Sequence, residues 1–132
     1  MEPLTCRVIR SGADYQGRQG FTYSAGLTGA TAGSRAICMT LVTLPPGARA
    51  KTHLHHGIET AVYVLEGETG MYFGARLCER LVAKAGEYIY IPADMPHLVL
   101  NHTSATCRAI VAHTSADDQD GIVLLPELDS VV

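Results

Sequence analysis

Short apolar runs separated by turn residues constrain the fold of this chain more than any other feature. Eight runs rich in β-branched, aromatic and aliphatic side chains recur at a spacing near ten residues, and helical periodicity is hard to find. They cover residues 35–44, 60–67, 69–74, 80–86, 87–92, 97–101, 106–114 and, less clearly, 121–126. Glycine and proline lie between them, as in Pro45-Pro46-Gly47. Many short strands with this punctuation predict an all-β sandwich or barrel.

The chain has 132 residues, a length that suits a single domain. Hydrophobic residues make up 47% of it, enough for a packed core. Residues 23–34 are rich in Gly, Ser and Thr and form either a loop or a weak edge strand. We therefore expect an N-terminal segment with possible edge strands, a barrel core, and a C-terminal extension that packs on the barrel. These parts cover residues 1–34, 35–114 and 115–132.

Charge and cysteine usage exclude several classes of protein. The net charge is −3, and only ten Lys and Arg residues are spread over the chain, which argues against a nucleic-acid partner. No apolar run approaches the roughly 20 residues that span a bilayer, and the first ten residues lack the apolar stretch of a secretory signal. The four cysteines form no CxxC pair. We expect a cytoplasmic protein with reduced thiols, and Cys38 and Cys107 in the core.

Three histidines lie close together in the stretch "THLHHGIE". Residues two apart in a strand share a face, so His53 and His55 project together. Glu59 follows the turn-prone pair His56-Gly57, where the chain can bend and return the carboxylate to the same place. Imidazole and carboxylate together suit Mn, Fe, Ni, Cu or Zn. The spacing favours a metal site, and the alternative is a set of solvated loop histidines.

A second segment, "GEYIYIPADMPHLVLN", contains a further candidate ligand. It has a glycine, a strand, a proline-bounded turn, and then His97 at the start of another strand. In a closed barrel, His97 could reach the same site from a neighbouring strand.

The first segment resembles the first sequence motif of the cupin family, G-x5-HxH-x3-E-x6-G. The matching residues are Gly47, His53, His55, Glu59 and Gly67. Seven residues follow Glu59 before the closing glycine, rather than six. The extra residue is consistent with a β-bulge, which leaves open the facing of several neighbouring side chains. These are Val62, Tyr63, Val64 and Leu65.

The second segment resembles the second cupin motif, G-x5-PxG-x2-H-x3-N. The matching residues are Gly86, Pro92, His97 and Asn101. Asp94 stands where the family usually has glycine, and Asp is among the few residues that accept a positive φ in a turn.

The resemblance covers roughly residues 35–112 and implies an antiparallel jelly-roll β-barrel with one metal ion inside. It also implies four metal ligands, which are His53, His55, Glu59 and His97. Three imidazoles and one carboxylate leave about two open positions on an octahedral ion, where a chelating small molecule could bind.

This ligand set favours a metal-dependent enzyme that acts on a small molecule. Iron, nickel or copper would suit a dioxygenase, whereas zinc, manganese or nickel would suit an isomerase or a cyclase. Glu59, if displaced from the metal, could act as a general base. The alternatives are a non-catalytic binding or sensing protein and a metal-free epimerase-like cupin, which the complete ligand set disfavours. One divalent transition metal ion would be the only cofactor.

Several further residues are candidates for lesser roles. We expect His56 at the surface or at the rim of the pocket, because it faces away from His55 if the strand persists. His102 and His113 match no motif position and are expected to be structural or solvated, and Asn101 is expected to be structural. The candidate residues of the substrate pocket are Met39, Tyr63 and Phe73.

The expected partners are a small-molecule substrate and a second copy of the chain. A small barrel with this hydrophobic content is expected to expose an apolar sheet face, and the resemblance implies sheet-to-sheet pairing. We therefore expect a homodimer.

Overall fold

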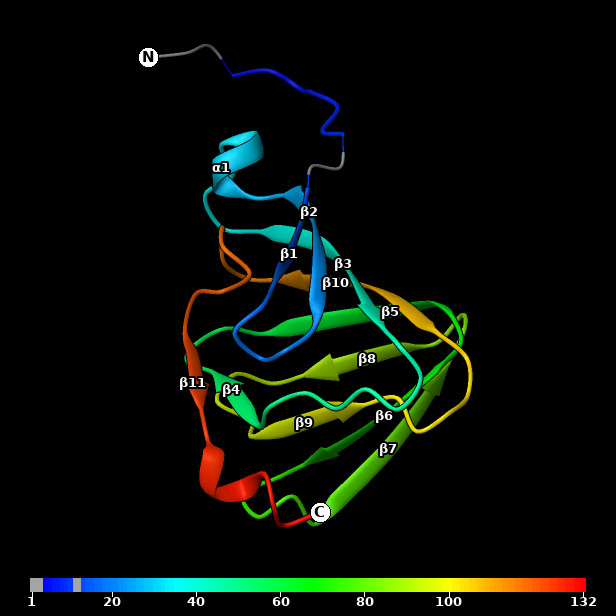
Figure 1. Cartoon of the computed structure of the whole chain (residues 1–132). Helices are drawn as coiled ribbons and strands as arrows, with labels where there is room; N and C mark the ends of the chain where they lie inside the picture. The colour runs from blue at the N-terminus through cyan, green and yellow to red at the C-terminus, as the bar shows by residue number, and fades with distance from the viewer. Residues whose placement is uncertain (1–3, 11–12) are drawn as a thin grey trace.

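The computed structural model describes residues 4–10 and 13–132 of the chain. Two antiparallel sheets face each other and enclose the core (Figure 1). The larger sheet has six strands in the order β1-β2-β3-β10-β5-β8, and the smaller has five in the order β11-β4-β9-β6-β7. Consecutive strands repeatedly cross from one sheet to the other, so the prediction of an all-β, antiparallel jelly-roll barrel is confirmed.

The strands of the larger sheet include an N-terminal hairpin that extends its edge. They are β1 (Asp14–Gln16), β2 (Thr22–Leu27), β3 (Cys38–Leu44), β10 (Cys107–His113), β5 (Thr60–Glu66) and β8 (Tyr88–Ile91). β2 pairs with β3, so the segment from residue 23 begins as a strand. It continues as the short helix α1 (Gly29–Ala32), whose first turn is capped by the side chain of Thr28.

The smaller sheet carries the histidine-rich segment. Its strands are β11 (Ile122–Leu124), β4 (His53–His55), β9 (His97–Leu100), β6 (Glu68–Phe73) and β7 (Glu79–Lys84), and the 3-10 helix η1 (Pro126–Leu128) follows β11. β4 has only three residues and lies between β11 and β9. The C-terminal segment therefore packs directly against the strand that bears His53 and His55.

Side chains of the two sheets alternate between core and surface, as strand geometry requires. In β3, for example, Val42 and Leu44 are buried, whereas Met39 is exposed. Cys38 and Cys107 are buried, as predicted, and all four cysteines are free thiols. The core contains Phe21, Tyr23, Val42, Leu44, Ala50, Val64, Met71, Ala83, Ile89, Ile91, Cys107 and Ala109.

A β-bulge lies at the end of β5, where the chain turns into the other sheet. Arg108 pairs with Glu66 but Ala109 pairs with Val64, so Leu65 is the extra residue. Gly67 follows with φ of 77°, and a Cβ atom there would lie 2.5 Å from the carbonyl oxygen of Thr106. Only glycine fits this corner. Before the bulge the facing is regular, so Thr60, Val62 and Val64 point inward and Tyr63 points outward.

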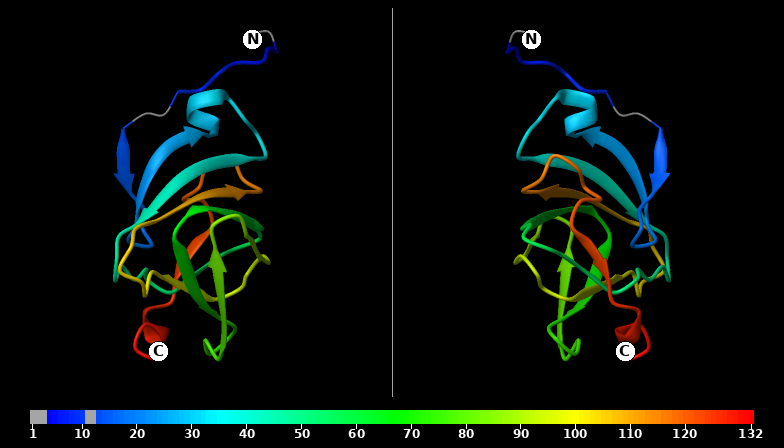
Figure 2. Two further views of the ribbon diagram at one scale, coloured as in Figure 1. Left: turned by 90° about the vertical axis from the view of Figure 1, so that its right-hand side faces the viewer. Right: turned by 90° about the vertical axis from the view of Figure 1, so that its left-hand side faces the viewer.

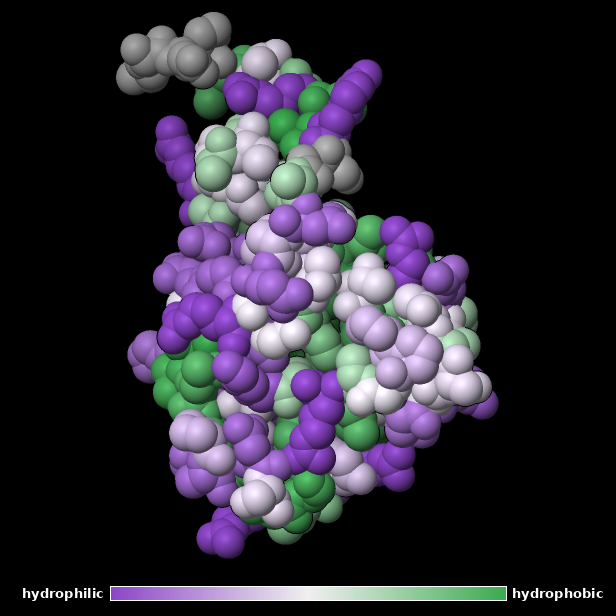
Figure 3. All heavy atoms as spheres, viewed as in Figure 1, coloured by the Kyte–Doolittle hydropathy of each residue, from purple (hydrophilic) through white to green (hydrophobic). Residues whose placement is uncertain are grey.

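The first described residues lie outside the barrel. Figure 2 shows residues 4–10 running away from the two sheets beyond α1. Hydrophobic side chains lie among hydrophilic ones on this projection (Figure 3), and Leu4 and Val8 are 96% and 78% exposed. Among residues 4–10 and 13–132, no helix has the length and apolar character needed to cross a membrane.

Candidate metal centre

Three buried histidines from two neighbouring strands meet inside the barrel. His53 and His55 lie two residues apart on β4, and His97 begins β9 directly opposite His53. One ligand atom from each lies within 4.8 Å of the others. The His53 ring centroid is 4.3 Å from that of His97 and 5.1 Å from that of His55. The strand geometry inferred from the HxH spacing therefore brings these imidazoles together.

Hydrogen bonds to the backbone fix the tautomers of two of these rings. Nδ1 of His53 lies 2.8 Å from the carbonyl oxygen of Lys51, and Nδ1 of His97 lies 2.8 Å from that of Met95. A carbonyl oxygen only accepts, so each Nδ1 carries the hydrogen and each Nε2 keeps its lone pair. Metal-bound histidines are typically oriented in this way.

The third ring contains a polar atom whose hydrogen-bonding capacity is unused. Nδ1 of His55 is buried and, within the described part of the chain, has no hydrogen-bond partner. Buried polar atoms without partners are rare and often mark the position of an absent ion or ligand. The donor set and this orphaned atom both fit a transition-metal ion.

Burial keeps these imidazoles neutral at physiological pH. Desolvation lowers the pKa of His53 well below its usual value, and the neighbouring His97 lowers it further. Desolvation also lowers the pKa of His55, and it lowers the pKa of His97 to about 4. Neutral imidazole is the form that binds a metal ion, so the site needs no deprotonation step at pH 7.

The histidines open onto a small apolar cavity of about 60 Å³ between the two sheets. Its walls are mainly aliphatic side chains such as Val42, Leu44 and Ile91. Polar side chains also line it, among them Gln19, Thr60, Thr69 and His113. Among the described residues that line the cavity there is no Asp, Glu, Lys or Arg.

Glu59, expected as the fourth ligand, does not join the three histidines. It is exposed, and its Oε1 accepts a hydrogen bond from the Tyr90 hydroxyl at 2.5 Å on the outer face of the larger sheet. Thr60, the next residue, is buried and lines the cavity. The motif spacing of six residues before the closing glycine, counted from Gly67, also leads to Thr60. Glu59 thus lies one residue before the first inward position of β5, and its carboxylate points outward.

His113 is the site residue that the sequence motifs do not reveal. It ends β10, is buried, and lies with its ring centroid 4.6 Å from that of His55. Its Nδ1 is 2.9 Å from the Thr60 hydroxyl, and burial lowers its pKa to about 3. A signal for it exists in the sequence, because alternation along the strand 106–114 from Cys107 places His113 on the inward face.

The three pocket candidates lie away from the cavity. Met39 is half-exposed on the outer face of β3, and Tyr63 faces outward with its ring 4.8 Å from that of Tyr88. Phe73 is partly buried at the edge of the core and does not line the cavity. Strand alternation determines the first two placements, because the residues that face inward are their immediate neighbours.

His56 lies at the surface, as expected, and belongs to a turn rather than to the cluster of three histidines. Its Nδ1 is 2.9 Å from a carboxylate oxygen of Asp94, which also accepts a hydrogen bond from the backbone N–H of Gly57. Asp94 has φ of 63°, so it adopts the glycine-like conformation that its motif position suggested. Its own N–H donates to the carbonyl oxygen of His55. This turn therefore connects the two histidine-bearing segments.

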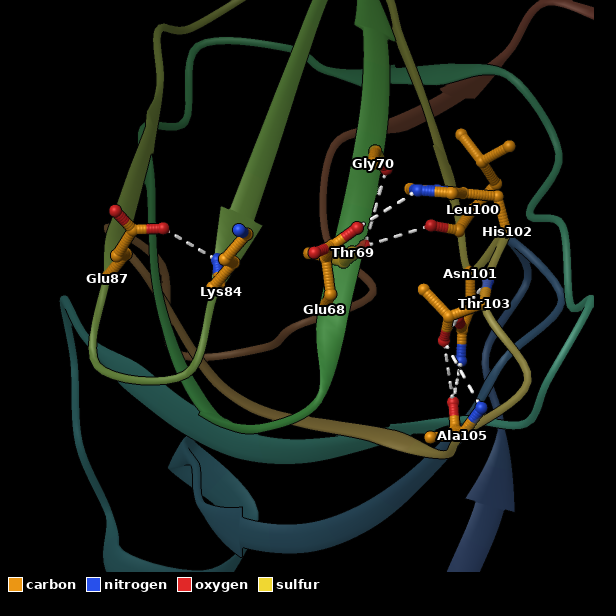
Figure 4. Close-up of polar contacts among 10 residues, drawn as sticks. All are labelled: Glu68, Thr69, Gly70, Lys84, Glu87, Leu100, Asn101, His102, Thr103 and Ala105. Carbon is orange, nitrogen blue, oxygen red and sulfur yellow. Dashed lines mark hydrogen bonds and ion pairs between the residues drawn. The ribbon is translucent and has the colours of Figure 1, made fainter.

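Asn101 and His102 have structural roles in the loop after β9 (Figure 4). The buried Asn101 amide donates to the carbonyl oxygens of Leu44 and Ala105, and its oxygen accepts hydrogen bonds from Thr103. His102 lies 3.0 Å from a carboxylate oxygen of Glu68 on the neighbouring β6. Asn101 thus anchors the end of β3 near the segment that leads to β4.

Comparison with known families gives one match that covers most of the barrel. A family model described as "Cupin domain" matches residues 40–113, a span that includes all four histidines of the cavity. A comparison with curated proteins found no match.

Solved structures with similar folds include both uncharacterised proteins and enzymes. The protein TT1209 from Thermus thermophilus is 29% identical over 62% of this chain and 75% of its own, with a TM-score of 0.56. An oxalate oxidase in complex with the substrate analogue glycolate is 23% identical, with a TM-score of 0.66, and the match spans 83% of this chain but 57% of that one. A mutant of Bacillus subtilis oxalate decarboxylase OxdC is also 23% identical with a TM-score of 0.66, over 95% of this chain and 30% of that one. At this identity the two oxalate enzymes support the fold alone.

Proposed function

The chain belongs to the cupin family, and from that premise we propose that it is a metal-dependent enzyme that acts on a small molecule bound inside the barrel. One observation carries the proposal: ligand atoms of His53, His55 and His97 lie within 4.8 Å of one another at the wall of an internal cavity. These three histidines are the proposed ligands, and Glu59 is outside the set.

The chemistry of the site depends on which ion it binds. Three imidazoles suit Mn, Fe, Ni, Cu or Zn, and such an ion supplies Lewis-acid or oxygen-activating chemistry when bound. The reaction would be a dioxygenation, an isomerisation or a cyclisation.

The surrounding residues have the task of binding the substrate and excluding water. The aliphatic walls lower the local dielectric constant, which strengthens every polar contact made inside. Gln19, Thr60 and His113 offer hydrogen-bonding groups that can orient a substrate. The proposal does not include Glu59 as a general base, because its carboxylate accepts a hydrogen bond from Tyr90 on the outer face.

One observation favours the second candidate, a non-catalytic binding or sensing protein. The described residues that line the cavity include no carboxylate that could shuttle protons. Assays of the metal-loaded protein with chelating small molecules distinguish the two functions, because an enzyme consumes its ligand and a sensor releases it unchanged.

The test of metal binding is elemental analysis of protein purified without a histidine tag. We expect about one transition-metal ion per chain. His53→Ala and His97→Ala should each remove most of it, whereas His56→Ala should leave it bound, because His56 is exposed and bonded to Asp94. Wild-type protein without metal affinity would contradict the proposal, as would a His56→Ala variant that is emptied as thoroughly as His53→Ala.

A further inference from the structure

We infer that the ligand of this site is a small oxyanion, such as a carboxylate or an enolate, whose negative charge completes the metal centre. The inference rests on the proposed function and narrows it to a class of ligand.

The argument begins with the charge of the donor set. His53, His55 and His97 are neutral donors, and Thr60 occupies the first inward position of β5. A divalent ion bound to them would bring two positive charges into a cavity with largely aliphatic walls. Burying charge without a counter-charge is costly, so the bound state needs an anion.

Acidic side chains around the site are bonded to other groups of the protein. Asp129 accepts a hydrogen bond from the Thr52 N–H at 2.7 Å. Glu59 bonds to Tyr90 on the outer face. Asp118 is buried, but its carboxylate accepts hydrogen bonds from the Tyr15 hydroxyl at 2.5 Å and from the Gln119 amide at 3.1 Å. Asp118 is not among the residues that line the cavity. The compensating charge must therefore come from a solute.

The small volume of the cavity favours a compact solute. The volume of about 60 Å³ corresponds to roughly four water molecules. Thr60 and His113, which bond to each other at 2.9 Å, place polar atoms in the cavity beside His55. A compact oxyanion can bind the metal through oxygen and still find hydrogen-bonding groups on the wall.

The first experiment uses wild-type protein, Mn²⁺ and two solutes of nearly equal size, glycolate and the neutral glycolamide. The dissociation constant of Mn²⁺ is measured by titration calorimetry with each solute at millimolar concentration. We expect glycolate to tighten Mn²⁺ binding by about tenfold and, by thermodynamic reciprocity, Mn²⁺ to tighten glycolate binding by the same factor. Glycolamide should change the constant by less than about twofold.

In the second experiment, a substitution in the protein supplies the negative charge that compensates the ion. Thr60→Glu places a carboxylate at the inward position, and Thr60→Gln is its neutral control of similar size. Thr60→Glu should bind Mn²⁺ about tenfold more tightly than wild type without any solute, and it should lose most of the response to glycolate. Thr60→Gln should keep the wild-type preference for glycolate over glycolamide. Circular dichroism checks that both variants are folded.

The outcomes separate this inference from the proposed function. If no metal binds to the wild-type protein, both fail. If Mn²⁺ binds but glycolate and glycolamide act alike, the metal site stands and the requirement for an anion is overturned. The wild-type comparison decides this point even if Thr60→Glu does not fold.

Discussion

Glu59 and Thr60 are adjacent in the chain but lie on opposite faces at the start of β5. Strand geometry turns successive side chains to opposite sides, so only one of the two can reach the cavity. The buried residue is Thr60, and the exposed residue is Glu59. This single step along the chain changes the donor set from three imidazoles and a carboxylate to three imidazoles alone.

The first prediction tests the exclusion of Glu59 from the site. Glu59→Gln should leave the affinity for metal within about twofold of wild type, because the carboxylate contacts Tyr90 at the surface and not the ion. Titration calorimetry measures this, and His53→Ala provides the contrasting variant in which affinity is lost. A large loss of affinity in Glu59→Gln would restore the four-ligand set.

At the scale of elements, the turn between β8 and β9 places His97 opposite β4. Asp94 in this turn has φ of 63°, and its side chain and N–H bond to the His55–Gly57 segment. Backbone conformation and hydrogen bonding can be separated here by two substitutions.

The second prediction concerns what the backbone conformation and the hydrogen bonds of Asp94 each contribute to the stability of the fold. Asp94→Gly loses the side-chain hydrogen bonds but keeps an unstrained backbone, whereas Asp94→Ala loses the bonds and is also strained at positive φ. We expect Asp94→Ala to be less stable than Asp94→Gly by about 1 kcal/mol. Urea unfolding of both variants measures the difference, and equal stabilities would show that the turn relaxes.

Periodicity explains how much of the fold and of the site could be predicted from the sequence. The apolar runs and the two motifs predicted the strands, the jelly roll and the three histidines that the structure brings together. The facing of Glu59 could not be predicted, because the loop before β5 has no period and a shift of one residue reverses the facing of every side chain in the next strand. His113 could have been found by extending the alternation of Cys107 and Ala109 along β10. The outward position of Tyr63 follows from the same alternation of side chains along a strand.

At the scale of the whole molecule, the outer face of the larger sheet is apolar across four strands. Two cross-strand rows run over it, defined by the register of β3, β10, β5 and β8. One row is Leu41, Ile110, Tyr63 and Tyr88, and the other is Met39, Ala112, Ala61 and Tyr90. Tyr88 and Tyr90 are 78% and 62% exposed. Exposed apolar patches of this kind favour association.

The third prediction is therefore a homodimer that pairs through this face. Light scattering should give twice the chain mass of 14.1 kDa at micromolar concentration. Ile110→Asp, at the centre of the face, should shift the protein toward monomer. Val82→Asp, on the exposed side of β7 in the other sheet, is the control and should leave the dimer intact. A wild-type mass of one chain would contradict the prediction.

The fourth prediction concerns the dependence of stability on metal and pH. A saturating metal ion at a thousandfold excess over its dissociation constant should stabilise the fold by about 4 kcal/mol at pH 7.5. The pKa values of His53 and His97 are lower in the folded protein than in the unfolded chain. The unfolded chain therefore takes up protons first, and stability that is complete above pH 6.5 declines as the pH falls toward 4.

Thermal unfolding of metal-free and metal-loaded protein at pH 7.5 and 5 measures both effects. The metal-loaded form should melt higher at pH 7.5, and both forms should melt lower at pH 5, because the unfolded chain takes up protons there while the folded imidazoles stay neutral. Equal melting temperatures at pH 7.5 would place the ion outside the barrel interior.

The position of β4 between β9 and β11 also determines when the site can form during synthesis. Ile122 and Leu124 pair with His55 and His53, and the N–H of Leu125 donates to the carbonyl oxygen of Thr52. The ribosome releases the chain from its N-terminus. The pairing of β4 with residues 122–124 therefore forms only after most of the barrel has left the exit tunnel. During this interval β4 has an open edge. A nascent chain that ends before residue 122 therefore lacks the strand that pairs with the histidine-bearing β4 in the finished protein.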